Sequence, residues 1–348
     1  MPTEEESVDG SPVPLDAAGG GAPAPQAPGE AEPRDVYVIA LVGSALAGAL
    51  GSIQGRMNGE LSALTHEPVE AAVWSFGSGL VILTVVVLLA ASVRRGLSGI
   101  VAALRGGSLR WWQVIGGTIG GLYVAVQSYA VPLVGVALFT VAVVAGQTGN
   151  GLVVDRLGIG PGGPKPVHVG RAAAAVLAIV GVVVSVWPRL GGHGLVLLPV
   201  VLSLLMGGGS ALQMGINGRV NLASRNVLST TWVNFGMGTA MLLVVALVKW
   251  AASDLHPAMP HGVPWWAWLG GVCGIGFIGT AAWAVRHLGV LVFGLALLTG
   301  QLSAAVVLDL VSPATRGDVT PAVVLGVLVT FVAAGLASWF ARRDRTAA

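Results

Sequence analysis

The chain has 348 residues, of which 54% are hydrophobic and only 10% are charged. Soluble domains carry about 25% charged residues, so this composition excludes a water-facing globular surface and requires that most of the surface contact lipid. The net charge of +2 conceals an uneven distribution, because residues 1–35 hold eight of the sixteen acidic residues and one basic residue. The remaining basic residues lie in short loops between apolar runs, which indicates membrane topology rather than nucleic-acid binding.

The first segment, residues 1–35, is rich in Pro, Ala, Gly and Glu and has no apolar periodicity, which predicts a disordered acidic tail. It lacks the basic start of a signal peptide. A helix that crosses the hydrocarbon core needs about 20 mainly apolar residues. Ten such stretches follow, at roughly 36–58, 70–93, 111–131, 133–155, 170–188, 194–217, 227–250, 265–285, 288–310 and 320–341.

The loops between these spans differ in charge. Cytoplasmic loops are enriched in Lys and Arg. With ten spans, one side of the membrane receives 14 of the 18 basic residues and the other side receives four. We therefore expect both termini to be cytoplasmic, with residues 342–348 as a short basic tail.

The sequence repeats itself at an offset near 159, which falls to 154 later in the chain. The matches follow one another in order, so chance does not explain them. They divide the chain into repeats at 36–190 and 191–341. The matching pairs include Gln54 and Gln213, Asn58 and Asn217, Phe76 and Phe235, Gly79 and Gly238, Gly146 and Gly300, Gln147 and Gln301, and Asp155 and Asp309.

Each repeat contains five predicted spans, and an odd number means that the second repeat is inserted upside down. The charges agree, because the Arg-rich loop 94–110 corresponds to 250–264, which contains no Arg. Inverted repeats are common in alternating-access transporters, where the substrate binds near the middle of the membrane between the halves. Channels can be built from inverted repeats too, so both classes stay open at this point.

A five-span repeat of this kind, with Gln-x-x-x-Asn-Gly ending its first helix, Phe-Gly-x-Gly in its second and Gly-Gln in its fourth, resembles the YdcZ-type family. That family is a bacterial inner-membrane branch of the drug/metabolite transporter superfamily, and the chain resembles its fused two-repeat form over residues 36–341. The resemblance implies an all-α membrane fold of ten transmembrane helices in two inverted repeats. It also implies a location in the bacterial cytoplasmic membrane and a small-molecule substrate, which it does not name.

Four amide side chains recur near the ends of the first and sixth spans. Gln54 and Asn58 are four residues apart and so share one helix face, and Gln213 and Asn217 repeat the arrangement. Amides in a membrane span are costly unless partnered, so we expect them to face the protein interior. They would contact substrate there, or form interhelical hydrogen bonds contributing about 0.6–2 kcal/mol each. A further interpretation is that Asn58 and Gly59 end the first helix.

Two glutamines, Gln147 and Gln301, lie in the middle of the fourth and ninth spans, each after a glycine. A glycine lets a ligand or another backbone approach closely. These two residues are our leading candidates for contact with substrate near the membrane midplane.

Other candidates lack a polar equivalent in the other repeat. Gln127 and Asn234 stand where the other repeat has Ala281 and Ser75. Such asymmetry suits an asymmetric substrate, and drift between the repeats explains it equally well. The tryptophans Trp74 and Trp283 lie deep in their spans, where they could line an aromatic pocket or pack in the core.

Two carboxylates, Asp155 and Asp309, lie near the ends of spans. An intramembrane carboxylate is the usual group for proton or ion coupling, so both are candidates for that role. The alternative is a water-exposed carboxylate at a helix end or an ion pair, for which Arg156 is a neighbour of Asp155.

Several classes of site are missing from the sequence. There is no Walker-type phosphate loop, no His-Glu-x-x-His motif and only one cysteine, Cys273. No spacing of Ser, Thr and His suggests a nucleophile with its base. We therefore expect no cofactor, no metal site and no enzymatic activity. The leading hypothesis is a secondary active transporter of a small organic solute; the alternatives are a membrane-embedded lipid-handling or enzymatic protein, a channel, or a scaffold.

Overall fold

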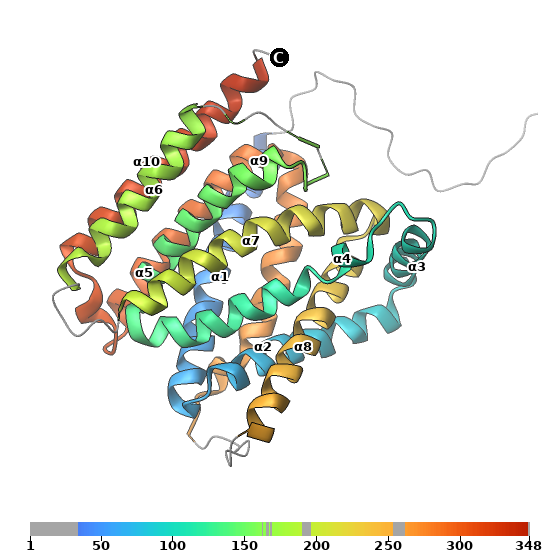
Figure 1. The fold of residues 1–348 in the computed structure, drawn as a ribbon, viewed down its shortest axis with the longest axis horizontal. Helices are drawn as coiled ribbons and strands as arrows, with labels where there is room; N and C mark the ends of the chain where they lie inside the picture. Colours follow the sequence, from blue (N-terminus) through green and yellow to red (C-terminus); the bar gives the residue numbers. More distant parts are fainter. Residues whose placement is uncertain are drawn as a thin grey trace, which may run out of the picture.

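The computed structural model describes residues 34–161, 163–164, 167, 169–189, 196–252 and 262–346. Nearly all of the predicted acidic tail lies outside these residues. Within the described ranges the regular elements are helices, connected by short turns (Figure 1). They are α1 (Arg34–Thr65), α2 (Pro68–Leu89), α3 (Ala91–Arg105), α4 (Trp111–Val114), α5 (Gly117–Arg156), α6 (Val169–Val186), α7 (Leu197–Ser224), α8 (Val227–Ala252), α9 (Gly270–Val311) and α10 (Pro321–Thr346), with short 3-10 turns at Trp187–Arg189, Trp265–Leu269 and Arg316–Asp318.

Seven helical segments of the described chain are long and apolar enough to cross a membrane. The protein is thus an all-α membrane protein with several spans. Two helices, α5 with 40 residues and α9 with 42 residues, each extend over two of the ten predicted spans. The number of membrane crossings therefore stays a prediction.

Helix α5 is broken near its middle. Pro132 has no N–H and its ring crowds the preceding turn. Three residues later, Gly135 adopts φ 82° and ψ 164°, a backbone conformation open to glycine and strained for other residues. The break lies close to the boundary predicted between the spans 111–131 and 133–155.

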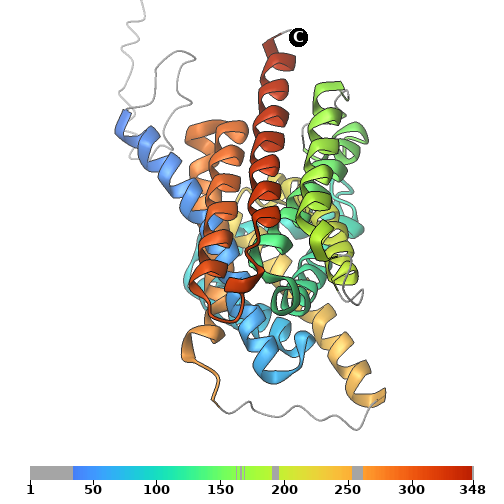
Figure 2. The ribbon, with the colours of Figure 1, turned by 90° about the vertical axis from the view of Figure 1, so that its left-hand side faces the viewer.

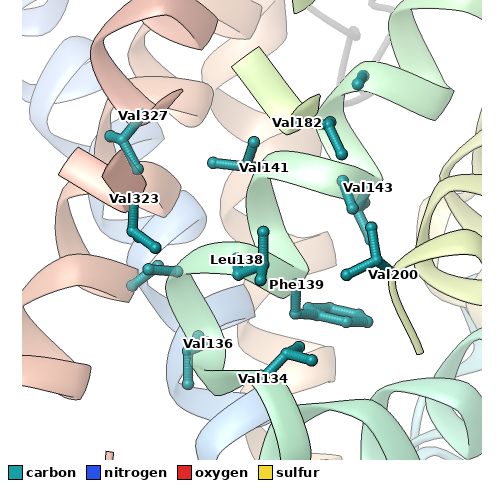
Figure 3. Packing of buried hydrophobic residues seen from close by; sticks show 14 of the residues in the cluster. Val134, Val136, Leu138, Phe139, Val141, Val143, Val182, Val200, Val323 and Val327 are labelled. Carbon is teal, nitrogen blue, oxygen red and sulfur yellow. The ribbon is translucent and has the colours of Figure 1, made fainter. Parts of the chain in front are cut away.

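The second segment of α5 is the centre of the main apolar core. Every residue from Val134 to Ala145 is buried. A helix that is apolar all round belongs in the interior of a protein. Figure 3 shows side chains of this segment between those of α6, α7 and α10, including Val182, Val200 and Val323.

Helices α6 and α10 pack along each other at one edge of the bundle, as both views show (Figures 1 and 2). Close approach is possible because small residues face one another there. A Cβ atom on Gly326 of α10 would clash with the Ser185 hydroxyl of α6. Small residues at such contacts are typical of membrane helices.

Equivalent glycines allow equivalent helix pairs to touch. A Cβ atom on Gly48 of α1 would clash with the carbonyl oxygen of Leu297 on α9, and one on Gly207 of α7 would clash with that of Val143 on α5. In the sequence repeat, Gly48 matches Gly207 and Val143 matches Leu297. The first helix of each half, α1 or α7, therefore packs against a helix of the other half, α9 or α5, through the same small-residue contact.

Helix α3 was not among the predicted elements, because residues 94–110 were interpreted as an Arg-rich loop. The structure forms a helix whose buried residues are Val93, Gly96 and Ile100. Its arginines lie on the exposed side, and the Ser229 hydroxyl of α8 donates a hydrogen bond to the Val93 carbonyl at 2.8 Å. An amphipathic helix thus connects the second and third predicted spans.

Candidate functional site

Two phenylalanines from the two halves of the chain meet in the interior. Phe76 of α2 and Phe235 of α8 are buried and stacked, with ring centroids 4.8 Å apart and an interplanar angle of 26°. A Cβ atom on Gly79 would clash with the Phe235 ring, and one on Gly238 would clash with the Phe76 ring. The Phe-Gly-x-Gly motif is thereby explained, since its last glycine makes room for the ring of the other repeat.

Three amides of the second half form a hydrogen-bonded group beside this pair. The Oδ1 atom of Asn234 on α8 accepts hydrogen bonds from Gln213 Nε2 at 2.8 Å and from Asn217 Nδ2 at 3.1 Å, both on α7. Gln213 lies at the ring edge, because a Cβ atom on Gly120 would be 2.5 Å from Gln213 Nε2 and 3.4 Å from Phe76 Cζ.

The first half contributes a second amide pair. Asn58 Nδ2 of α1 donates a hydrogen bond to Gln127 Oε1 of α5 at 3.1 Å, and both side chains are buried. Gln54, one turn earlier, lies beside Phe235: a Cβ atom on Gly274 would be 3.2 Å from Gln54 Nε2 and 3.3 Å from Phe235 Cζ. The two halves thus place glutamines at the two ends of the aromatic pair.

Two polar atoms at this place have no hydrogen-bond partner among the described residues. They are the Oδ1 atom of Asn58 and the Oγ atom of Ser75. Both face the same point, since a Cβ atom on Gly270 would clash with the former and be 2.9 Å from the latter. A buried polar atom without a partner costs about 1–3 kcal/mol, and the close approach of Gly270 to both atoms requires that this residue be a glycine.

We call the six amides around the stacked rings the amide cluster: Gln54, Asn58, Gln127, Gln213, Asn217 and Asn234. The structure brings them together from α1, α5, α7 and α8. It also shows why Gln127 and Asn234 lack polar equivalents. Gln127 accepts a hydrogen bond from Asn58 in the first half, and Asn234 accepts one from the equivalent Asn217 in the second half. The two acceptors lie on helices that are not equivalent in the repeat, since Gln127 is on α5 and Asn234 is on α8.

The glutamines Gln147 and Gln301 lie outside this cluster's hydrogen bonds. Gln147 Nε2 on α5 is 3.0 Å from Met214 Sδ on α7, and the backbone carbonyl of Gln301 accepts a 2.7 Å hydrogen bond from Ser52 Oγ on α1. The glycine that precedes each glutamine has a packing role. A Cβ atom on either glycine would clash with a carbonyl oxygen, that of Leu204 or that of Ala45.

Near Gln147 there is a cavity of about 440 Å³ between α5, α6 and α7. Asn150 lines it and donates a hydrogen bond to the Gly208 carbonyl at 2.7 Å. Sequence reasoning did not single out Asn150, although it is a polar residue one turn from Gln147 in the same span.

Of the two candidate tryptophans, Trp74 is the one whose side chain the structure describes. Trp74 is 43% exposed and its ring makes an edge contact with Trp268, with centroids 5.0 Å apart. It therefore lies at the turn that begins with Trp265. The side chain of Trp283 is outside the described residues.

The two repeat-related carboxylates have different surroundings. Asp155 forms an ion pair with Arg171 of α6, with an N–O distance of 2.5 Å and side chains 29% and 19% exposed respectively. Asp309 is only 1% exposed and accepts hydrogen bonds from the backbone N–H groups of Val136 at 3.0 Å and Ala137 at 2.7 Å.

Those N–H groups are the first ones after the break at Gly135. The first N–H groups of a helix have no partner inside the helix, and a carboxylate there also interacts favourably with the helix dipole. Asp309 of α9 thus caps the second segment of α5. In the sequence this cap is hidden, because the partners are more than 170 residues apart.

Comparison with known proteins agrees with the duplication seen in the sequence. The family model described as "Putative inner membrane exporter, YdcZ", of the drug/metabolite transporter group, matches the chain twice, over residues 39–184 and 198–336. No curated protein sequence matches the chain. The two matched segments lie within the repeats inferred at 36–190 and 191–341.

Proposed function

Since the chain belongs to the YdcZ family of the drug/metabolite transporter superfamily, in the form that carries the family's repeat twice, we propose that it is a secondary active transporter of a small organic solute. The two halves would form inverted five-helix repeats with ten spans and both termini in the cytoplasm. They would rock against each other so that a central site faces each side of the membrane in turn.

The observation that carries this proposal is the reciprocal contact at the aromatic pair. Gly79 makes room for Phe235, and the equivalent Gly238 makes room for Phe76. When two units are related by a two-fold axis, residue i of one contacts residue j of the other and the reverse contact also forms. This exchange supports a two-fold relation between the halves, with the stacked rings at its centre.

The amide cluster surrounds that centre and is our proposed substrate site. Its six side chains are neutral, and amides both donate and accept hydrogen bonds. The unpartnered oxygens of Asn58 and Ser75 would accept hydrogen bonds from the solute. A neutral, hydrogen-bonding solute with a flat face that stacks against Phe76 or Phe235 fits this chemistry.

For coupling, Asp155 is the better candidate of the two carboxylates. Its side chain is partly exposed, and its ion pair with Arg171 can open when a proton or cation binds. Both oxygens of Asp309 are occupied by backbone N–H groups, which suits a structural cap.

The proposal is tested by flux into proteoliposomes together with thermal shift on the purified protein. A bound solute raises the melting temperature, because it binds the folded state. We expect a neutral solute from a library to stabilise the wild type and to be taken up with saturation. The variant Gln54→Ala with Gln213→Ala should fold but lose both responses, whereas the matched amide variant Asn150→Ala should retain them.

Other outcomes would refute parts of the proposal. Uptake and thermal shift equal to wild type in the double variant would show that the amide cluster is not the substrate site. Flux that rises linearly with solute concentration, without saturation, would indicate a channel. If no library member stabilises the protein or crosses the membrane, the transporter proposal fails.

A further inference from the structure

Helix α3 is short, amphipathic and placed at the edge of the helix bundle, beside α4 and away from α6 and α10 (Figure 1). Gly96 and Gly99 let it lie directly against the end of α7 and the start of α8, where Ser229 and the Ala223 carbonyl are its neighbours. A helix with one apolar face and an Arg-bearing face is typical of segments that lie in the plane of a membrane interface.

A notch lies at the end of this helix. The chain turns at Gly107, where φ is 73°, and is anchored by buried Leu109, whose N–H donates to the Ala103 carbonyl at 3.1 Å. The turn leaves a hollow of about 600 Å³ on the surface. Its lining residues are Leu104, Gly107, Leu109, Arg110, Trp111 and Trp112.

The charge around the notch is positive. No acidic residue occurs in the sequence between Glu70 and Asp155. Within the described part of the chain, no ion pair joins a carboxylate to the exposed arginines Arg95, Arg105 or Arg110. An exposed cationic patch of this kind complements an anion.

The lining of the notch is also aromatic and apolar. Trp111 is 73% exposed, and Trp112 lies next to it. Exposed tryptophans beside arginine are typical of the membrane–water interface, where the ring contacts the glycerol and upper acyl region while the charge contacts the headgroup. A soluble phosphate would use the arginine but not the tryptophans.

We propose that this notch, formed by α3, the turn at Gly107 and α4, binds one anionic phospholipid. The guanidinium of Arg110 holds the headgroup phosphate, with a planar fork that matches two of its oxygens. Trp111 and Trp112 contact the glycerol and acyl chains, and Arg95 and Arg105 add to the positive potential. The bound lipid would stabilise the packing of α3 against the ends of α7 and α8. Lipid binding in the notch is independent of the proposed transport function.

The test uses the full-length protein in detergent micelles, titrated with phosphatidylglycerol or phosphatidylcholine, with thermal shift and native mass spectrometry as readouts. Phosphatidylglycerol should bind more tightly than phosphatidylcholine and less tightly at high salt. Arg110→Gln should weaken phosphatidylglycerol binding about fivefold, since one basic residue near an anionic surface contributes to that extent. Trp111→Ala should weaken the binding of both lipids.

The matched control is Arg316→Gln, which removes the same charge from an exposed position in the turn between α9 and α10. It should bind phosphatidylglycerol as the wild type does. Arg110 is exposed, and the hydrogen bond that it gives to Gln113 Oε1 comes from its backbone N–H, so the substitution should preserve the fold. Equal loss in Arg110→Gln and Arg316→Gln, or equal binding of the two lipids, would overturn the proposal. Full competition by millimolar glycerol phosphate would assign the notch to a soluble phosphate instead.

Discussion

Replacing Asp309 by asparagine should destabilise the protein by removing half of the cap on the second segment of α5. The carboxylate is 1% exposed and accepts the N–H groups of Val136 and Ala137 at 3.0 and 2.7 Å. Asparagine offers one acceptor oxygen, so one of the two N–H groups would face an amide NH2 group that cannot accept. A buried N–H that loses its acceptor costs about 1–3 kcal/mol, which is the expected loss.

The matched control is Asp155→Asn, the same substitution at the equivalent position of the other repeat. Its partner is a side chain, Arg171, and both are partly exposed. Such ion pairs contribute about 0–1 kcal/mol, so this variant should be nearly as stable as the wild type. Asp309→Ala, which removes both acceptors, should lose about 2–6 kcal/mol on the same reasoning.

Stability would be measured by unfolding in mixed detergent micelles with increasing dodecyl sulfate, and by melting temperature. Amide hydrogen exchange supplies a local readout, because loss of the cap should accelerate exchange at Val136 and Ala137 more than at distant core amides. Equal stability of Asp309→Asn and Asp155→Asn, with unchanged exchange at Val136 and Ala137, would show that Asp309 does not cap the helix.

Two further predictions concern the centre of the protein. Gly79→Ala should lower the free energy of unfolding by about 1–3 kcal/mol, because its Cβ atom would clash with the Phe235 ring. The control Gly77→Ala should be tolerated, because no atom lies within 4 Å of its Cβ position. Equal melting temperatures for the two variants would contradict the stacked arrangement. A double-mutant cycle of Asn217→Ala and Asn234→Ala should give a coupling energy of about 0.6–2 kcal/mol, because the 3.1 Å hydrogen bond joins the two side chains. If the losses of unfolding free energy in the two single variants add up to the loss in the double variant, that hydrogen bond is excluded.

Much of the architecture was predictable from local properties of the chain. The small share of charged residues and the long apolar stretches predicted an all-α membrane protein, and the ordered matches predicted two related segments, which the family model also matches. The helix missed in the sequence was α3. Its arginines suggested a loop, although Val93, Gly96 and Ile100 follow the three-to-four residue spacing of a helix face.

The candidate site was predictable only in part. The repeated amides at Gln54, Asn58, Gln213 and Asn217 were visible as matching pairs, but their partners were not. Asn58 bonds to a residue 69 positions away on α5. Which amide accepts such a hydrogen bond depends on which helices pack together, and the sequence pattern does not contain that information.

The sequence by itself determined that the chain enters the membrane, because the transfer of each apolar stretch into lipid depends on that stretch alone. It also determined that the chain is a duplication, because the matching residues follow one another in order. Only the tertiary structure decided what each polar group does there. Asp155 and Asp309 are equivalent in the repeat, yet one pairs with Arg171 and the other caps the broken helix α5. The physical reason is that a buried polar group takes its role from its partners, and packing brings partners together across the whole length of the chain.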